Sequence, residues 1–260
     1  MRENKWFKFG NFLYLLMFLS LESFVYAIFI LEDFDFNVDV DPDLYKYESM
    51  ILLLIFYFFS FLLNLLIEKI EKDHVKEIRY DMIIVGCALI FTFLSDTFLL
   101  YLDKYYEIGV SSFIVVQVLY FIRMAYGLKF SNKRLYTSIF IRVGLSFLAI
   151  IGLVIADSFS FLYSITGIYF INIVMNFIDS LISTINLRGD KRFITSLIFT
   201  IGLILFIGCD IFVGISNLSP YGSEIIWIFY LPSQILIALS ASRLYGFTLG
   251  KDVNTYEQRS

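Results

Sequence analysis

The sequence predicts an all-α polytopic membrane protein with eight transmembrane helices. Of its 260 residues, 59% are hydrophobic, including 30 Phe and 18 Tyr, and the mean hydropathy is +0.78. Apolar stretches of about 20 residues, the length needed to cross a bilayer as a helix, recur along the chain. Charged residues are sorted into the connecting segments, and no Pro/Ser-rich linker divides the chain. A single integral membrane domain over residues 1–260 is therefore expected.

Each span follows from its apolar run. The first follows a basic start and continues to Leu31, long enough to cross a membrane. An acidic stretch from Glu32 to Glu48 separates it from the second, and a charged stretch from Glu68 to Asp81 precedes the third; the remaining connections are short. The predicted spans are about 11–31, 49–67, 82–102, 108–127, 135–156, 161–186, 193–214 and 224–246.

The basic residues orient these spans. Alternate segments carry 15 Lys and Arg residues, whereas the intervening loops hold only Lys46 and Lys104. By the positive-inside rule, both termini are expected to be cytoplasmic. Phe, Ile, Tyr and Asn are abundant beside scarce Ala and Pro. AT-rich codons supply this bias, which indicates a bacterial source and hence the inner, or plasma, membrane.

Several classes of site are disfavoured. Cys87 and Cys209 lie inside predicted spans, where they behave as small apolar residues and indicate no disulfide framework. The single histidine, His74, lies in a charged loop, so a zinc site is not expected. No metal, cofactor or nucleic-acid partner is predicted. Membrane lipids are the expected partners, and the sequence leaves the oligomeric state open.

Two aspartates inside apolar spans, Asp96 and Asp210, are the most informative residues. Both lie in the same frame: Leu-Ile, four residues, a small Ser or Cys, the Asp, any residue, and Phe. A charge at the centre of a bilayer costs about 3 kcal/mol or more unless it is neutralised or paired, so such residues indicate function. Two in matching surroundings strengthen that interpretation.

The resemblance between the two halves extends further. Gln117 in the fourth span and Gln234 in the eighth each follow an aromatic residue by four positions and precede Val-Leu or Ile-Leu. Spans three and seven then correspond, as do four and eight. This pattern predicts a four-plus-four parallel duplication about an axis along the membrane normal, with Asp96 and Asp210 facing each other. The alternative is chance similarity in a Phe/Ile/Leu-rich sequence.

Helical rise places both aspartates in the outer part of their spans. Other polar residues fall at comparable depth in spans four, six and eight, and a cavity in the outer half of the bundle is expected, suited to an amphiphile. The predicted lining residues besides the aspartates are Gln117, Tyr120, Tyr169, Asn172, Asn176, Tyr230 and Gln234.

The other charges within the spans are interpreted as structural. Arg142 and Asp179 are expected to form an ion pair between neighbouring helices. Arg123 and Arg243 are expected to extend to the inner boundary. Glu22 lies in the middle of the first span, and the sequence suggests no partner for it.

Several short motifs resemble the YhhN-type lysoplasmalogenase family. Ser95-Asp96-x-x-Leu99 is followed by Gly109-x-x-x-Phe113-x-x-x-Gln117-x-x-Tyr120, similar to the family's G-D-x-x-L and G-x-x-x-F-x-x-x-H-x-x-Y. Further matches are Gly208-Cys209-Asp210 and Tyr230-x-x-x-Gln234-x-Leu236-Ile237. The similarity covers residues 82–246. Gln117 replaces the family histidine, Ser95 replaces a glycine, and no Lys-Pro pair opens the second span.

The resemblance implies hydrolysis of the vinyl ether bond of a lysoplasmalogen, a lysophospholipid, to a fatty aldehyde and a glycerophospho-alcohol. Asp96 and Asp210 are the expected catalytic acid and base, with neither role assigned to one of them, and the polar lining residues would orient water or the glycerol hydroxyl.

Two other functions are compatible with the sequence. A small-solute or proton-coupled transporter also places ionisable residues between repeats, although no broken helices are apparent. A non-catalytic lipid-binding protein of the same fold is consistent with Gln117 in place of histidine.

Overall fold

The computed structural model describes residues 5–33, 42–68, 75–127, 130–190, 192–215 and 222–242. Within these ranges the chain forms eight α-helices, one π-helical turn and no β-strand, which confirms the predicted all-α class. The helices are α1 (Lys5–Asp33), α2 (Pro42–Glu68), α3 (Val75–Asp96), α4 (Tyr106–Gly127), α5 (Asn132–Ile155), α6 (Phe161–Asn186), α7 (Phe193–Ile215) and α8 (Gly222–Ser242). The π-helical turn η1 (Thr97–Tyr101) continues α3.

The helices match the predicted spans closely. Seven of them, α2 to α8, are long and apolar enough to cross a membrane. The apolar part of α1 is shorter, Phe12–Ile28. The eighth span was expected to reach residue 246, whereas α8 is described only to Ser242, and the remaining positions lie outside the described residues.

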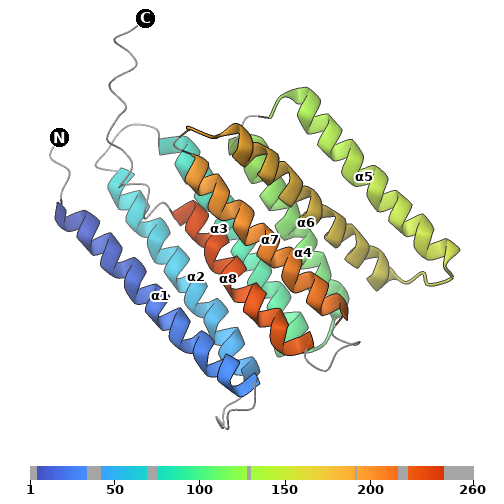
Figure 1. Cartoon of the computed structure of the whole chain (residues 1–260), viewed down its shortest axis with the longest axis horizontal. Helices are drawn as coiled ribbons and strands as arrows, with labels where there is room; N and C mark the ends of the chain where they lie inside the picture. Colours follow the sequence, from blue (N-terminus) through green and yellow to red (C-terminus); the bar gives the residue numbers. More distant parts are fainter. Residues whose placement is uncertain are drawn as a thin grey trace, which may run out of the picture.

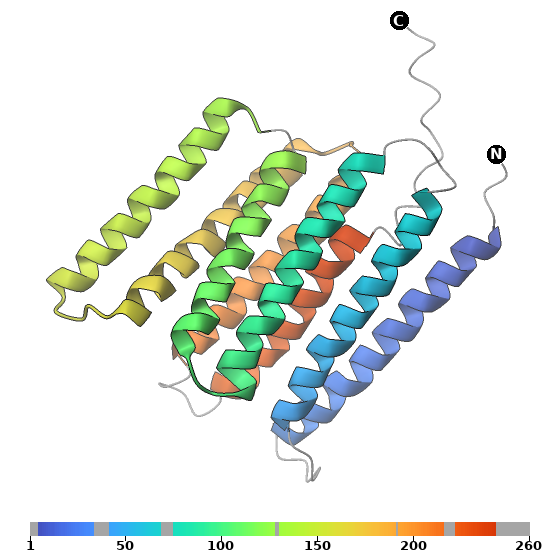
Figure 2. The same cartoon turned by 180° about the vertical axis from the view of Figure 1, so that it is seen from behind.

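The helices run side by side along a common direction (Figure 1). The α1–α2 pair lies at one edge and α5 at the other. Between these edges, α3 and α4 lie behind α7 and α8, and the view from the opposite side brings α3 and α4 to the front (Figure 2). The most extensive packing is within the α7–α8 and α3–α4 pairs, and α4 also packs against α6.

Small residues allow the α7–α8 helices to approach closely. A Cβ atom at Gly202 of α7 would lie 2.8 Å from Ile237 Cγ1 and 3.1 Å from the Ser233 carbonyl oxygen of α8. Apolar burial drives helix association weakly in a bilayer, so close backbone packing of this kind contributes much of the stability. In the α3–α4 pair, the Ser95 hydroxyl donates to the Gly109 carbonyl oxygen at 2.6 Å.

Proline shapes α8 in a way that ties it to α1. Pro232 lies inside α8 and has no N–H, so the carbonyl oxygen of Ile228, one turn earlier, lacks its usual helical donor. The Tyr26 hydroxyl of α1 donates to this oxygen at 3.4 Å. The contact joins α1 to the bundle at the depth of the aromatic core.

Helix neighbours in the two halves of the chain correspond in part, since the α3–α8 contact has no comparable counterpart between α7 and α4. The contacts α1–α2, α2–α3, α3–α4 and α2–α8 have counterparts in α5–α6, α6–α7, α7–α8 and α6–α4. This arrangement is compatible with a four-plus-four duplication. The duplication itself stays a prediction, because the hydrogen bonds of the two aspartates, described next, do not follow it.

Candidate active site

Asp96 is the last residue of α3 and is almost fully buried, with 5% of its surface exposed. The Tyr230 hydroxyl of α8 lies 2.7 Å from both carboxyl oxygens of Asp96 and donates its one proton to them as a shared hydrogen bond. Directly after Asp96 the helix widens into η1, where the Leu102 amide donates to the Thr97 carbonyl oxygen at 2.9 Å. Single π-turns inside helices often occur at functional sites.

Asp210 lies in α7 and has a tyrosine partner of its own. The Tyr169 hydroxyl of α6 donates to Asp210 Oδ2 at 2.7 Å. The other carboxyl oxygen, Oδ1, makes no hydrogen bond to the described residues, and Asp210 is partly exposed. One oxygen of Asp210 therefore remains available to a ligand.

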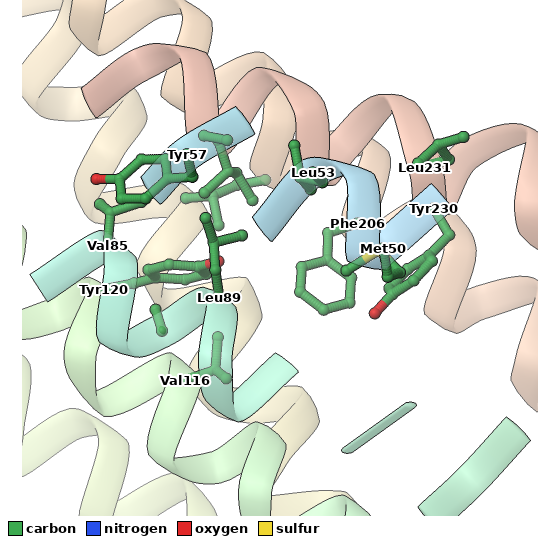
Figure 3. Close-up of a cluster of buried hydrophobic side chains, with 14 of the residues drawn as sticks. Met50, Leu53, Tyr57, Val85, Leu89, Val116, Tyr120, Phe206, Tyr230 and Leu231 are labelled. Atoms are coloured by element: carbon green, nitrogen blue, oxygen red, sulfur yellow. The ribbon is translucent and has the colours of Figure 1, made fainter. Parts of the chain in front are cut away.

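A single aromatic side chain joins the two Asp–Tyr pairs. The Phe206 ring packs edge-on against Tyr230, Tyr169 and Phe113, with centroid separations of 5.7, 6.5 and 5.6 Å. Figure 3 shows Phe206 and Tyr230 side by side in the buried core. Cys209, directly before Asp210, is buried in the same core. The structure thus links Asp96, Asp210, Tyr169 and Tyr230 through Phe206, and their role as site residues stays a prediction.

The two pairs are not symmetric. Asp96 of α3 takes its tyrosine from α8, and the predicted repeat would give Asp210 of α7 a partner from α4. The observed partner, Tyr169, comes from α6. The two carboxyl groups therefore take their hydroxyl partners from two helix positions that the repeat does not relate.

Lys46 is a neighbour of this cluster, although hydropathy places this residue in a loop. It lies in α2, is 5% exposed, and its Nζ is 3.5 Å from Asp43 Oδ1 and 6.0 Å from the centroid of the Trp227 ring. The Trp227 ring packs edge-on against Tyr230 at 5.0 Å. A buried cation thus lies one aromatic ring beyond the Asp96–Tyr230 pair. The sequence feature that could have indicated Lys46 is its rarity: Lys46 and Lys104 are the two basic residues in the segments predicted to lie opposite the basic face.

The predicted lining residues Gln117, Asn172 and Asn176 belong to a different polar network. Asn176 donates to the backbone and side-chain oxygens of Gln117 at 2.8 and 2.9 Å. Arg142 donates to the side-chain oxygens of Asn172 and Asn176 at 3.2 and 3.0 Å and to Asp179 at 2.9 Å. These residues make no hydrogen bond to either candidate aspartate.

This network contains the predicted Arg142–Asp179 ion pair, with both side chains buried. Ser138 donates a further hydrogen bond to Asp179 at 2.7 Å. Because every charged atom has a close partner, the burial of these charges is explained without substrate. The amides of Asn172 and Asn176 serve to complete the network.

Tyr120 and Gln234 are fully buried on the same helices as Phe113 and Tyr230, closer to the basic face. The Tyr120 hydroxyl lies near Thr92, but neither group makes a hydrogen bond of good geometry to the described residues. Gln234 Oε1 and Gln117 Nε2 are also without a partner there. The unpartnered atoms of these residues can therefore still make hydrogen bonds, at a position between the aspartates and the basic face.

Two further buried charges differ in their environment. Arg123 is 7% exposed and bonds to Asp81 at 2.7 and 3.2 Å and to Ser240 at 2.8 Å, and Asp81 lies at the start of the apolar part of α3, so the prediction that Arg123 extends to the inner boundary stays a prediction. Asp81 offers the guanidinium a bidentate partner. Arg243 lies outside the described residues. Glu22 is 1% exposed, with no hydrogen-bond partner in the described ranges.

No group of three or more His, Cys, Asp or Glu side chains in the described part of the chain is arranged to hold a metal ion. The described site consists of carboxyl, phenol and aromatic groups with one lysine nearby. Acid and base chemistry is what such groups supply directly.

Comparison with known proteins identifies one family. The model of the YhhN family matches residues 44–241, a region that includes both Asp–Tyr pairs and Lys46 and excludes α1. No curated protein and no solved structure matches the chain.

Proposed function

The chain belongs to the YhhN family, and from that premise we propose that it hydrolyses the vinyl ether bond of a lysoplasmalogen, releasing a fatty aldehyde and a glycerophospho-alcohol. The observation that carries the proposal is the pair of aspartates joined through Phe206, each hydrogen-bonded by a tyrosine hydroxyl. Family membership supports a function of this kind at the level of the family.

The reaction requires an acid and a base at one site. A proton is added to the vinyl carbon remote from oxygen, which leaves an oxocarbenium ion at the carbon bonded to the glycerol oxygen. Water adds to that carbon and loses a proton, and the resulting hemiacetal releases the aldehyde while the glycerol oxygen regains a proton. Two carboxyl groups divide proton donation and water activation in the same way in glycoside hydrolysis.

The surroundings of the aspartates suit these steps. The free Oδ1 of the partly exposed Asp210 can contact water or the reacting carbon, while Tyr169 holds Oδ2 in place. The aromatic rings of Phe113, Phe206 and Tyr230 make the surroundings of the aspartates apolar, as an alkenyl chain would require. A carboxylate beside an oxocarbenium ion in such a poorly hydrated site stabilises it more strongly than water would.

The substrate headgroup also has a candidate contact. A lysoplasmalogen carries a phosphate a few bonds from the vinyl ether, and Lys46 lies one aromatic ring, Trp227, beyond the Asp96–Tyr230 pair. In this proposal the phosphate binds Lys46 in competition with Asp43, whose side chain is mostly exposed. The unpartnered atoms of Gln117, Tyr120 and Gln234 supply hydrogen-bonding groups to water beneath the site.

The test is aldehyde release by the purified protein from lysoplasmenyl-ethanolamine, with the saturated ether analogue as the substrate control. In D₂O, protonation at carbon would place one deuterium on the carbon next to the aldehyde group. In H₂¹⁸O, the glycerophospho-product would contain no ¹⁸O. The bond that breaks joins the vinyl carbon to the glycerol oxygen, so the glycerol keeps its own oxygen atom.

The Asp96→Asn and Asp210→Asn variants are each expected to lower turnover by at least about 100-fold, the lower range for loss of a general acid or base. Asp157→Asn, a change at an exposed turn residue, is the matched control and is expected to be neutral. Folded wild-type protein that releases no aldehyde would refute the proposed reaction. Normal turnover by one of the two Asn variants would remove that aspartate from the mechanism.

A further inference from the structure

A groove between α5 and α6 lies apart from the aspartate cluster. Its volume is about 410 Å³. The residues that line it come from the first three turns of α5 and the later turns of α6, with Ser131 before the start of α5. These ends of α5 and α6 are next to connections rich in Lys and Arg, so the groove opens near the basic face of the protein.

The groove has one charged end and one apolar side. Lys133 and Arg134 lie at the start of α5, where Ser131 caps the helix by accepting a hydrogen bond from the Arg134 amide at 3.3 Å. Along α6, Met175, Ile178 and Ile182 are spaced by three and four residues and therefore share one helix face. The groove therefore has positively charged residues at the start of α5 and an apolar side along α6.

The positive charge at this end exceeds the negative charge. Asp179 is the one acidic residue in the lining, and its carboxylate is already paired with Arg142 at 2.9 Å and hydrogen-bonded by Ser138. Arg134 forms an ion pair with Asp179, with Arg134 Nη2 3.7 Å from Asp179 Oδ1, and is also held by hydrogen bonds to the Asp179 carbonyl oxygen at 3.1 Å and to Ser183 at 3.0 Å and by stacking on Phe130. Lys133 is exposed and forms no ion pair with the described residues, so the two lining cations outnumber the one lining carboxylate.

The position of α5 leaves the groove open to lipid. In Figures 1 and 2, α5 is the outermost helix at its edge of the bundle, and α6 is its principal neighbour. Its membrane-facing residues are mostly exposed, among them Ile141, which lines the groove at 41% exposure. A molecule can therefore enter from the bilayer without displacing a helix.

We propose that this groove binds an anionic phospholipid from the leaflet on the basic face, with the headgroup phosphate at Lys133 and Arg134 and one acyl chain along α6. This occupant is chosen because its negative headgroup complements the positive charges of Lys133 and Arg134. Basic pockets between transmembrane helices on the cytoplasmic side bind anionic headgroups. The site is separate from the proposed hydrolase site and does not depend on its activity.

The experiment measures lipid retention by native mass spectrometry of the full chain, with phosphatidylglycerol and phosphatidylcholine of identical acyl chains as probes. The wild type is expected to retain phosphatidylglycerol preferentially. Each basic residue near a membrane surface contributes about a fivefold gain in affinity for anionic lipid. Lys133→Gln is therefore expected to reduce retention of phosphatidylglycerol about fivefold, and Lys133→Gln/Arg134→Gln more strongly.

Two further variants separate charge from shape. Thr137→Trp places a large side chain in the groove while leaving both basic residues intact, and is expected to abolish selective retention. Arg188→Gln removes an exposed basic residue of the same face that does not line the groove, and is expected to leave retention unchanged.

Three results would overturn the proposal. The first is equal retention of phosphatidylglycerol and phosphatidylcholine by the wild type, and the second is an undiminished preference for phosphatidylglycerol in the Lys133→Gln and Thr137→Trp variants. The third is that Thr137→Trp loses a dimer and not a bound lipid. The last result would assign the groove to a second copy of the chain. Because Lys133 is exposed, its substitution is not expected to affect folding, and thermal unfolding of each variant checks this.

Discussion

The two candidate catalytic carboxyl groups differ in how their oxygens are used. Asp96 is buried and shares the Tyr230 hydroxyl between both oxygens, whereas Asp210 is partly exposed and engages only Oδ2. A group that must contact substrate or water needs a free oxygen, and Asp210 has one. The sequence frames of the two residues are nearly identical, so this difference arises from neighbouring helices and not from local sequence.

Loss of either tyrosine hydroxyl is expected to lower turnover while leaving the fold intact. Hydrogen bonds to charged groups contribute about 1.5–3 kcal/mol, which corresponds to a decrease of about 10- to 100-fold for Tyr230→Phe or Tyr169→Phe. The phenyl rings would keep their packing on Phe206. Aldehyde release is the measurement, and Tyr163→Phe, an exposed position on α6, is the control. Unchanged turnover in both Phe variants would show that the tyrosines do not position the carboxyl groups.

Lys46 is expected to determine affinity for the headgroup and not the rate of the chemical step. Lys46→Gln should raise KM for a lysoplasmalogen about tenfold, because a charge-assisted contact with phosphate is lost. It should have little effect on the corresponding alkenylglycerol, which has the vinyl ether but no phosphate. Lys104→Gln, at the exposed basic residue of the neighbouring loop, is the control. Equal effects on both substrates would assign Lys46 a structural role.

At the scale of elements, hydropathy predicts where helices cross the membrane and leaves out the turns beyond the apolar core. The second span is predicted to begin near residue 49, whereas α2 begins at Pro42. Lys46 and Asp43 lie in this additional polar segment of α2, and their ion pair is compatible with a helix at the interface. A hydropathy window cannot detect such a segment, and the buried Lys46 is consequently missed.

The close approach of α7 and α8 makes Gly202 sensitive to substitution. Gly202→Ala is expected to destabilise the protein by about 1–3 kcal/mol, because the added Cβ would meet the backbone oxygen of Ser233 as well as Ile237. Thermal unfolding in detergent measures the effect. Gly152→Ala in α5 is the matched control, since its Cβ would meet no atom within 4 Å. A Gly202→Ala variant as stable as the control would mean that α7 and α8 are not so tightly packed.

At the scale of the whole molecule, the sequence predicted the helices and the family, whereas it did not predict how the polar residues pair with one another. Depth along a helix predicts which residues share a layer and says nothing about which face they occupy. Gln117, Asn172 and Asn176 lie at suitable depths yet bond to one another and to Arg142. Arg123 likewise has a partner on another helix, Asp81, 42 residues away in sequence. Such pairings depend on helix arrangement, which periodicity does not encode.

Orientation in the membrane is the remaining global property, and the charge distribution predicts it. Three crossing helices, α4 to α6, separate Lys104 from Arg188. An odd number of crossings places these residues on opposite sides of the membrane, and the positive-inside rule puts Arg188 in the cytoplasm. Both aspartates lie toward the Lys104 end of their helices, so the proposed hydrolase site would draw substrate from the outer leaflet.

Cysteine accessibility tests this orientation. In a background with Cys87→Ser and Cys209→Ala, the Lys104→Cys variant is expected to react with a membrane-impermeant maleimide in intact cells. The Arg188→Cys variant should react only after permeabilisation, because the reagent cannot reach the cytoplasmic face. The reversed pattern would place the aspartates in the inner leaflet and substrate entry on the cytoplasmic side. Labelling of both positions from one side would contradict the three crossings. It would indicate that one of the three helices does not span the bilayer, and α5, which packs mainly on α6, would be the first candidate.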